Sequence, residues 1–242
     1  MRTIFLFILY VILVIFLIPV VFFCSIFRTA RPLYILGRSA IRLGQWILGL
    51  KIQIVGLDGL DKKKTYVFMP NHISFLDGPL MFLIIPRYMR VIFKKEILRI
   101  PIIGWAMKIA EFIPVDRKGI QGGRKSVERA TQLILKKGYD FLIFPEGTRS
   151  LDGTMKPLKR GGFFLAINSQ TDIVPVSIQG TFEIMPKGQF SVRKGVIKVV
   201  FHPAISVKGC TVENLPNLSE KVRFAIASGL GEGRKRNEND PV

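Results

Sequence analysis

The residues best suited to chemistry lie between Met69 and Pro79, a segment that contains His72 and Asp77. It follows an apolar stretch at 66–69 and is bounded by Pro70 and Gly78–Pro79, so we expect a strand that runs into a turn. On a regular α-helix, residues five apart point roughly 140° away from each other. The two side chains can therefore meet only if the intervening chain is a turn or an irregular helix start. In that geometry Asp77 would hold the His72 ring in one tautomer and His72 would act as a general base.

A second polar motif, Phe144–Ser150, also follows an apolar, strand-like stretch, at 141–144. Ligand sites in open α/β sheets lie at the carboxyl ends of strands. Two such strand ends that both carry ionisable residues predict one shared site. The plainer alternative is that one histidine and one aspartate occur in a turn by chance.

Together, Asn71-His72-x-Ser74-x-x-Asp77 and Phe144-Pro145-Glu146-Gly147-Thr148-Arg149-Ser150 closely resemble two motifs of the glycerolipid acyltransferases. The likeness is greatest to the bacterial 1-acyl-sn-glycerol-3-phosphate (lysophosphatidic acid) acyltransferases. Two weaker family blocks resemble Ile113–Arg117 and Ile173–Ser177, so the resemblance spans roughly residues 51–203. The chain departs from the family at Glu111, where glycine is common, and at Pro114, which replaces a bulky apolar residue.

The resemblance implies transfer of an acyl group from acyl-ACP (acyl carrier protein) or acyl-CoA to the sn-2 hydroxyl of lysophosphatidic acid, giving phosphatidic acid in phospholipid biosynthesis. His72 would be the general base and Asp77 its orienting partner. The substrate hydroxyl would be the nucleophile, and the chain has no Gly-x-Ser-x-Gly nucleophile elbow. Ser74 is the competing nucleophile because it lies so close to His72.

The resemblance also implies residues that bind the substrates. An arginine fork suits a phosphate, and backbone N–H groups and lysines add to such a site. The candidates are Arg149 and Arg117 for the phosphate, the backbone of Gly147 and Thr148, Glu146 as an ordering group, Lys94 for the oxyanion or phosphate, and Lys159–Arg160 for added charge. For each arginine or lysine, the alternative is a solvated surface charge.

The acyl chain is expected to lie along apolar surface, with the helix at 80–85 and residues Ile102, Ile103 and Trp105 as candidates; the alternative for these residues is ordinary core. No metal site is expected, since the only two histidines, His72 and His202, are far apart in sequence and no cysteine cluster is present. No cofactor is expected beyond the thioester co-substrate.

The composition points to an anionic partner. The 242-residue chain has 36 Lys and Arg against 17 Asp and Glu, a net charge of +19, and is 49% hydrophobic. Such an excess fits lipid headgroups, an acidic carrier protein or nucleic acid. Nucleic acid is disfavoured because the basic residues are scattered and the N-terminus is strongly apolar. Two cysteines, one of them in the apolar N-terminus, fit a reducing compartment.

The N-terminal region is expected to bind the membrane. Thr3–Phe27 is uncharged and long enough to span a bilayer, and a cleaved signal peptide is the alternative. Leu33–Leu50 has the pattern of an interfacial helix, so a helix pair in one leaflet is a rival to a full span. Arginines after the first segment predict that the following domain faces the cytoplasm, on the inner membrane.

Strands alternate with helices along the rest of the chain, which indicates an α/β domain with a mostly parallel or mixed sheet flanked by helices. We expect a membrane-anchoring helix pair at 1–50, the acyltransferase domain at 51–228 and a polar, disordered tail at 229–242. Glycines 119, 122 and 123 are expected to form a loop, and the clearest helix is expected at 126–137.

Two other functions stay open. A sibling acyltransferase would use glycerol 3-phosphate or another lysolipid, such as lyso-ornithine lipid. A non-enzymatic alternative is a basic peripheral membrane protein that binds anionic lipid.

Overall fold

The computed structural model describes residues 2–100, 102–116, 120–189 and 191–231. Eight α-helices are present in these ranges: α1 (Arg2–Ile26), α2 (Arg31–Leu48), α3 (Asp77–Ile84), α4 (Ile103–Ile109), α5 (Ile120–Lys137), α6 (Gly161–Ser169), α7 (Thr181–Ile184) and α8 (Leu215–Leu230). The strands are β1 (Leu50–Val55), β2 (Val67–Pro70), β3 (Arg90–Lys94), β4 (Ile113–Val115), β5 (Phe141–Leu142), β6 (Ile173–Gln179) and β7 (Gly195–Phe201).

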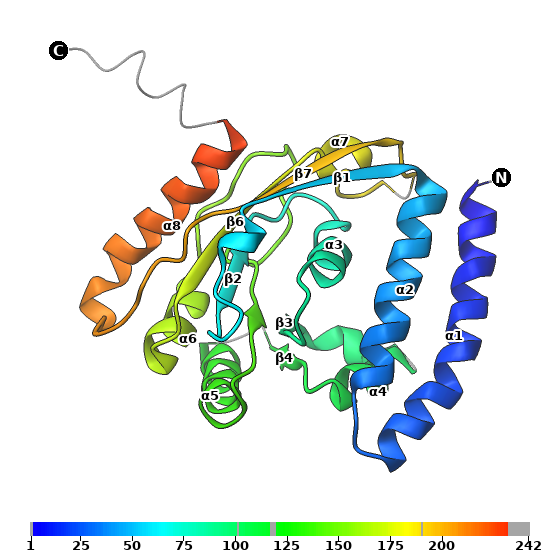
Figure 1. Cartoon of the computed structure of the whole chain (residues 1–242), viewed down its shortest axis with the longest axis horizontal. Helices are drawn as coiled ribbons and strands as arrows, with labels where there is room; N and C mark the ends of the chain where they lie inside the picture. The colour runs from blue at the N-terminus through cyan, green and yellow to red at the C-terminus, as the bar shows by residue number, and fades with distance from the viewer. Residues whose placement is uncertain (1, 101, 117–119, 190, 232–242) are drawn as a thin grey trace.

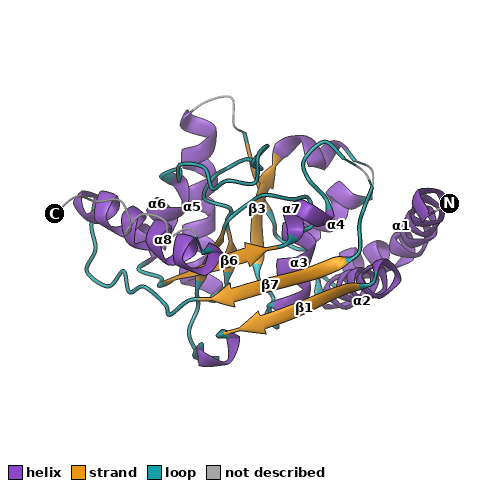
Figure 2. Ribbon diagram, turned by 90° about the horizontal axis from the view of Figure 1, so that it is seen from above, coloured by secondary structure: helices purple, strands orange, loops and turns teal. Residues whose placement is uncertain are grey.

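The strands form one seven-stranded sheet in the order β1-β7-β6-β2-β5-β3-β4. β6, β2, β5, β3 and β4 run parallel, whereas β7 pairs antiparallel with β6 and parallel with β1. Figure 2 shows the arrows of β7 and β1 opposed to that of β6. The expected mixed α/β sheet is therefore confirmed. Because β2 lies between β5 and β6, the carboxyl ends of β2 and β5 are neighbours.

Helices cover both faces of the sheet, and each face has its own core. Alternate residues of β2 point to opposite sides: Val67 and Met69 pack with α5, α6 and α8, and Phe68 packs with α3. Figure 1 shows α5, α6 and α8 on one side of the sheet and α3 and α2 on the other. The parallel strands are buried on both faces, which explains why their sequences read as continuous apolar runs.

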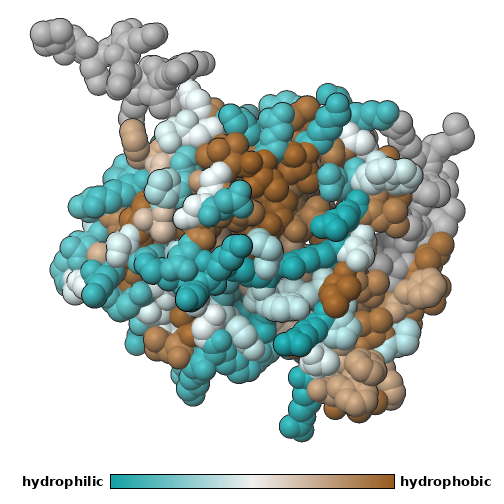
Figure 3. Space-filling view, in the orientation of Figure 1, coloured by the Kyte–Doolittle hydropathy of each residue, from teal (hydrophilic) through white to brown (hydrophobic). Residues whose placement is uncertain are grey.

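The N-terminal helices α1 and α2 form an antiparallel pair beside the domain (Figure 1). α1 also packs on α4 through a small cluster that includes Val21, Cys24 and Ile102. α2 exposes Ile35, Leu43 and Trp46, of which Trp46 is 79% exposed. Apolar surface also gathers around the α1–α2 turn, at the lower right of Figure 3. Within the described part of the chain, no helix combines the length and the apolarity that crossing a membrane requires.

The expected glycine loop is wrong at Gly122 and Gly123, which lie in the first turn of α5. A side chain at Gly122 would approach the carbonyl oxygen of Asp116 to 2.7 Å, so the helix starts this early only because that residue is glycine. At the other end, α8 continues to Leu230, into the stretch expected as a polar tail. The rest of that tail, 232–242, lies outside the described residues.

His202 and Ser177 connect α8 to the sheet, and His202 is expected to make the stability of the fold depend on pH. Ser177 Oγ donates to the carbonyl of Ile226 in α8 at 2.7 Å and lies 2.7 Å from His202 Nε2. Burial lowers the pKa of His202 below its usual value. The unfolded chain therefore binds more protons than the folded protein as the pH falls below about 6.5, and stability contributed by neutral His202 is lost in that window.

We expect the free energy of unfolding to fall more between pH 7.5 and pH 5.5 in the wild type than in His202→Gln. Urea unfolding at the two pH values measures this, and the other titrating groups are common to both proteins. An equal fall in both would show that His202 does not contribute.

Candidate active site

His72 and Asp77 meet because the chain between them is not helical. β2 ends at Pro70, residues 71–76 form a turn, and Asp77 is the first residue of α3. His72 Nδ1 lies 2.9 Å from Asp77 Oδ2. This is the turn geometry that the spacing required. The carboxylate accepts the Nδ1–H, so the lone pair of the ring is at Nε2.

Asp77 is fully buried and is the centre of the turn. Its Oδ2 also accepts the backbone N–H groups of Ile73 and Ser74, each at 2.8 Å. Its Oδ1 accepts the hydroxyl of Thr181, the first residue of α7, at 2.7 Å. Four hydrogen bonds satisfy a charge that would otherwise be costly to bury. Asp77 thus fixes both the ring of His72 and the backbone that carries it.

The second motif lies against the first, as the shared-site prediction required. The backbone N–H of His72 donates to Glu146 Oε1 at 2.6 Å, and the backbone N–H of Ser150 donates to the carbonyl of His72 at 2.9 Å. The ring of Phe144 stacks on the His72 ring, with centroids 4.0 Å apart. The two strand ends therefore form one site, and the side chain of His72 remains 19% exposed.

Glu146, expected as an ordering group, is buried and bonded to the backbone of two segments. Its residue is only 1% exposed, and its second carboxylate oxygen accepts the backbone N–H of Lys156 at 2.9 Å. Burial raises the pKa of Glu146, and the hydrogen bonds from the Lys156 and His72 backbones oppose that shift. Glu146 therefore joins the His72 turn to the loop around Lys156, which is an ordering role.

Arg149 lies where a phosphate ligand could approach. Its guanidinium is half-buried over the exposed ring of Phe75, 5.7 Å from the centroid, and has no carboxylate partner among the described residues. Its carbonyl accepts from Lys156 Nζ at 3.2 Å and Lys187 Nζ at 3.3 Å. Three positive side chains therefore come from one small region, and two of them, Lys156 and Lys187, were not predicted from the sequence.

The other predicted binding residues differ in placement. The N–H of Gly147 is already used, since it donates to the carbonyl of Phe144 at 3.0 Å, so the expected contribution of this N–H is wrong. Gly147 itself is needed because φ is +70° there and a Cβ would lie 2.9 Å from Lys159. Thr148 is exposed. Lys94 is exposed at the end of β3, 3.6 Å from Glu96. Arg117 lies outside the described residues.

Ser74, the competing nucleophile, is buried, and its hydroxyl is hydrogen-bonded to groups other than His72. Its Oγ donates to the carbonyl of Met185 at 2.7 Å and accepts the N–H of Leu76 at 3.2 Å. Its proton is therefore directed away from His72. Across the described ranges, no group of three or more His, Cys, Asp or Glu side chains is placed to hold a metal ion.

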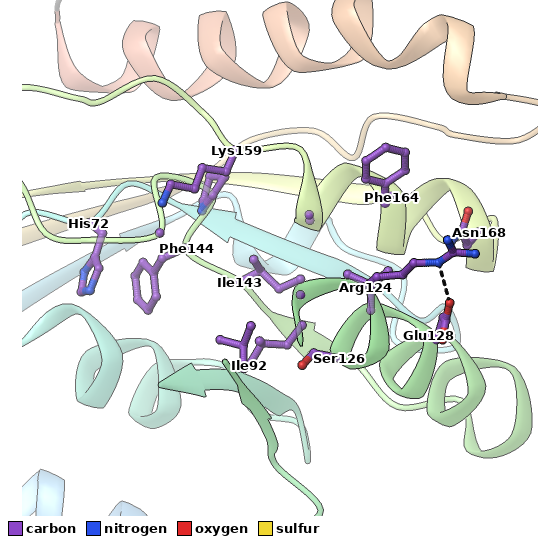
Figure 4. A pocket seen from close by; sticks show the side chains of 17 residues that line it. His72, Ile92, Arg124, Ser126, Glu128, Ile143, Phe144, Lys159, Phe164 and Asn168 are labelled. Atoms are coloured by element: carbon purple, nitrogen blue, oxygen red, sulfur yellow. Dashed lines mark hydrogen bonds and ion pairs between the residues drawn. The ribbon is translucent and has the colours of Figure 1, made fainter. Parts of the chain in front are cut away.

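A cavity of about 670 Å³ opens beside His72, a volume typical of ligand sites. It runs between the sheet, α5 and α6. Its walls are mainly apolar, formed by Ile92, Val115, Val127, Ile143, Phe144 and Phe164. Figure 4 shows His72 and Lys159 at one end and the ion pair of Arg124 and Glu128, with Asn168, at the other.

The side chains expected to lie along the acyl chain do not line this cavity. Leu80 and Ile85 are buried core residues, and Ile102 packs against α1 instead. Sequence reasoning missed the cavity because its lining comes from several elements, with no continuous apolar stretch to mark it. Thr181 was missed for a similar reason, since it is 104 positions from Asp77.

Comparisons with known proteins agree with this geometry. The acyltransferase family model matches residues 51–179. A 1-acyl-sn-glycerol-3-phosphate acyltransferase of Limnanthes douglasii is 31% identical over 190 residues, which are 78% of this chain and 67% of that protein. The enzyme of the same name from Borreliella burgdorferi is 29% identical over 201 residues, covering 83% of this chain and 80% of its own.

A solved structure shares the fold. The 1-acyl-sn-glycerophosphate acyltransferase of Thermotoga maritima superposes with a TM-score of 0.77, covering 99% of this chain and 96% of that one, at 22% identity. The family model spans more than half of the chain and includes both motifs of the site. The chain therefore belongs to the acyltransferase family.

Proposed function

We propose that the protein is a 1-acyl-sn-glycerol-3-phosphate acyltransferase, which esterifies the sn-2 hydroxyl of lysophosphatidic acid to give phosphatidic acid. One observation carries the proposal: His72, bonded to a buried carboxylate, lines an apolar cavity, and its carbonyl is bonded to Ser150, the residue after Arg149, which has two neighbouring lysines. An acyl thioester and a phosphate-bearing alcohol need those two surroundings. The names of the relatives support the acceptor.

In the proposed mechanism the acceptor hydroxyl attacks the thioester carbonyl while His72 Nε2 takes its proton. The tetrahedral intermediate then collapses, the C–S bond breaks, and the same proton passes to the leaving thiolate. Asp77 stabilises the imidazolium that forms in between, as in other histidine–carboxylate pairs. Lys159 lines the cavity beside His72 and is the cation best placed to stabilise the oxyanion.

The donor and the location are parts of the same proposal. Acyl-ACP and acyl-CoA are both anionic and suit a chain of net charge +19. The exposed apolar side chains of α1 and α2 support membrane binding, with the catalytic domain on the cytoplasmic face of the inner membrane. We propose no cofactor besides the thioester co-substrate.

The test supplies purified protein in vesicles with acyl-ACP or acyl-CoA, each with lysophosphatidic acid, glycerol 3-phosphate or lyso-ornithine lipid. We expect phosphatidic acid from lysophosphatidic acid and much less product from the other acceptors. Transfer only to another acceptor would keep the chemistry and overturn the acceptor. Lipid binding without transfer to any acceptor, by a folded protein, would favour the non-enzymatic alternative.

Arg149→Ala is expected to lower kcat/KM for lysophosphatidic acid by about 10- to 100-fold, since charge-assisted hydrogen bonds are worth about 1.5–3 kcal/mol. The KM of the thioester donor should change little. Lys208→Ala is the matched control, because Lys208 is an exposed cation that has no expected role in the site. A loss confined to donor use, or an equal loss in Lys208→Ala, would contradict the phosphate role of Arg149.

Gly123→Leu tests the cavity as the acyl site. Gly123 lies in α5 and lines the cavity, and an added Cβ there meets no atom within 4 Å. The substitution removes a helical glycine, which favours folding, and adds a side chain beside the cavity. We expect activity with long acyl donors to fall more than with short ones, at least tenfold on the scale of a lost hydrophobic contact.

Gly123→Ala is the control for the loss of glycine alone. Competition assays with mixed chain lengths give the preference directly. An unchanged preference in Gly123→Leu would place the acyl chain elsewhere.

A further inference from the structure

A second cavity, of about 650 Å³, lies away from His72 and is lined by several charged side chains. The α1–α2 turn, the starts of α2 and β3, and the ends of α4 and α5 surround it. Arg90 begins β3 and Tyr139 precedes β5, so the cavity is at the amino edge of these parallel strands. The catalytic turn is at their carboxyl edge. The two cavities share no lining residue among those described.

The lining of this cavity has excess positive charge. Arg28, Arg31, Arg90 and Lys137 face a single carboxylate, Glu111. Arg28 and Arg31 are exposed, and within the described ranges neither has a carboxylate within ion-pair distance. Four cations and one anion leave a net charge of +3 around one concave space. An anion would relieve this repulsion.

Arg90 is the most buried of these four cations, and its charge is only partly neutralised. The side chain of Arg90 is 5% exposed and shares Glu111 with Lys137 and Tyr139. Its guanidinium lies 3.7 Å from the centroid of the Tyr139 ring, and its Nε has no hydrogen-bond partner. A desolvated guanidinium that holds part of one carboxylate attracts a further anion more strongly than a surface arginine does.

The chain adopts unfavourable backbone conformations around this cavity. Glu111 has φ of +56° and Arg28 has φ of +49°, values that favour glycine. Each left-handed residue costs roughly 1 kcal/mol. The strained backbone at Glu111 places its carboxylate where it forms ion pairs with both Arg90 and Lys137. The strained backbone at Arg28 turns the chain between α1 and α2. The start of α2, at Arg31, adds the positive end of a helix dipole.

Exposed apolar side chains directly precede Arg28 in the chain. Phe22, Phe23 and Ile26 are exposed on the last turns of α1, and Phe27, between the end of α1 and Arg28, is exposed as well. Hydrocarbon chains can lie on that surface while a phosphate enters the cavity. Free phosphate would contact the cations alone and would gain no affinity from these apolar side chains.

We propose that this cavity binds the phosphate headgroup of a membrane phospholipid, with the lipid chains along the end of α1. This is a binding site separate from the acceptor phosphate site at Arg149. The proposal does not depend on acyl transfer. The bound lipid would fix the orientation of the helix pair relative to the catalytic domain at a membrane that contains anionic lipid.

The test uses full-length protein in neutral detergent and three probes: dihexanoyl phosphatidylglycerol, dihexanoyl phosphatidylcholine and inorganic phosphate. We expect phosphatidylglycerol to bind at least tenfold more tightly than inorganic phosphate and to raise the unfolding temperature. Arg28→Ala/Arg31→Ala should weaken that binding by about tenfold or more. Inorganic phosphate that binds as tightly as phosphatidylglycerol would overturn the lipid as the source.

Three further variants make the test specific. Arg129→Ala/Lys208→Ala removes two exposed cations elsewhere and should change the affinity less than threefold. Arg149→Ala should also bind phosphatidylglycerol normally, and a loss there would place the lipid in the catalytic site. Glu111→Gln removes the only carboxylate of the lining and should tighten binding about threefold, which damage to the fold would not do. Equal losses in both double variants would show general charge attraction and overturn the proposal.

Discussion

His72→Ala is expected to lower kcat by about 10²- to 10⁴-fold, the usual contribution of a general base. The loss follows from the geometry, because Nδ1 is bound to Asp77 and Nε2 is the remaining nitrogen that can take a proton. The backbone of His72 holds the two motifs together through Glu146 and Ser150, and alanine keeps both of those contacts. The variant should therefore fold and bind both substrates. Steady-state kinetics with lysophosphatidic acid, together with circular dichroism, measure the effect.

Ser74→Ala is the matched control. It removes the hydrogen bond to the Met185 carbonyl and should cost about 1–3 kcal/mol of stability, since a buried acceptor loses its partner. Its kcat should stay within about tenfold of the wild type. A loss in Ser74→Ala as large as in His72→Ala, with an acyl-enzyme visible by mass spectrometry, would make Ser74 the nucleophile. Near-normal turnover by His72→Ala would remove the general-base assignment.

Asp77→Asn is expected to lower kcat by roughly 10³- to 10⁴-fold, the scale seen when a catalytic histidine loses its carboxylate. Asparagine has nearly the same shape but no charge to stabilise the imidazolium. One of its two terminal atoms is also a donor, so it cannot repeat the carboxylate's set of four accepted hydrogen bonds. We expect stability to fall as well, by about 1–3 kcal/mol.

Thr181→Val separates these two effects. It removes only the hydroxyl bonded to Asp77 Oδ1 and leaves the charge and the His72 contact in place. Stability should fall by a similar 1–3 kcal/mol, and kcat by less than about tenfold. Urea unfolding and kinetics on both variants give the comparison. If kcat falls equally in the two variants, Asp77 acts by holding the fold and has no separate chemical role.

The sequence determined the elements and the two motifs. Apolar runs ended by proline, glycine or polar residues marked strands at about 66–69, 141–144 and 173–178, close to where β2, β5 and β6 lie. The spacing of His72 and Asp77 allowed their side chains to meet only across a turn or an irregular helix start, and the structure has a turn there. The match to a family motif then assigned the chemistry. These signals are local, because a strand, a cap or a turn is encoded by neighbouring residues.

Tertiary structure decided which partners each of those residues has. Glu146, which the sequence offered as an ordering group without fixing its partners, became a buried link between two backbones. Lys156 and Lys187 joined Arg149, and Thr181 joined Asp77, from elements far along the chain. The cavity beside His72 and the basic cavity at Arg90 are both lined by several elements. Such partnerships depend on how the faces of the sheet pack, and a single sequence records which residues are apolar but not which of them meet.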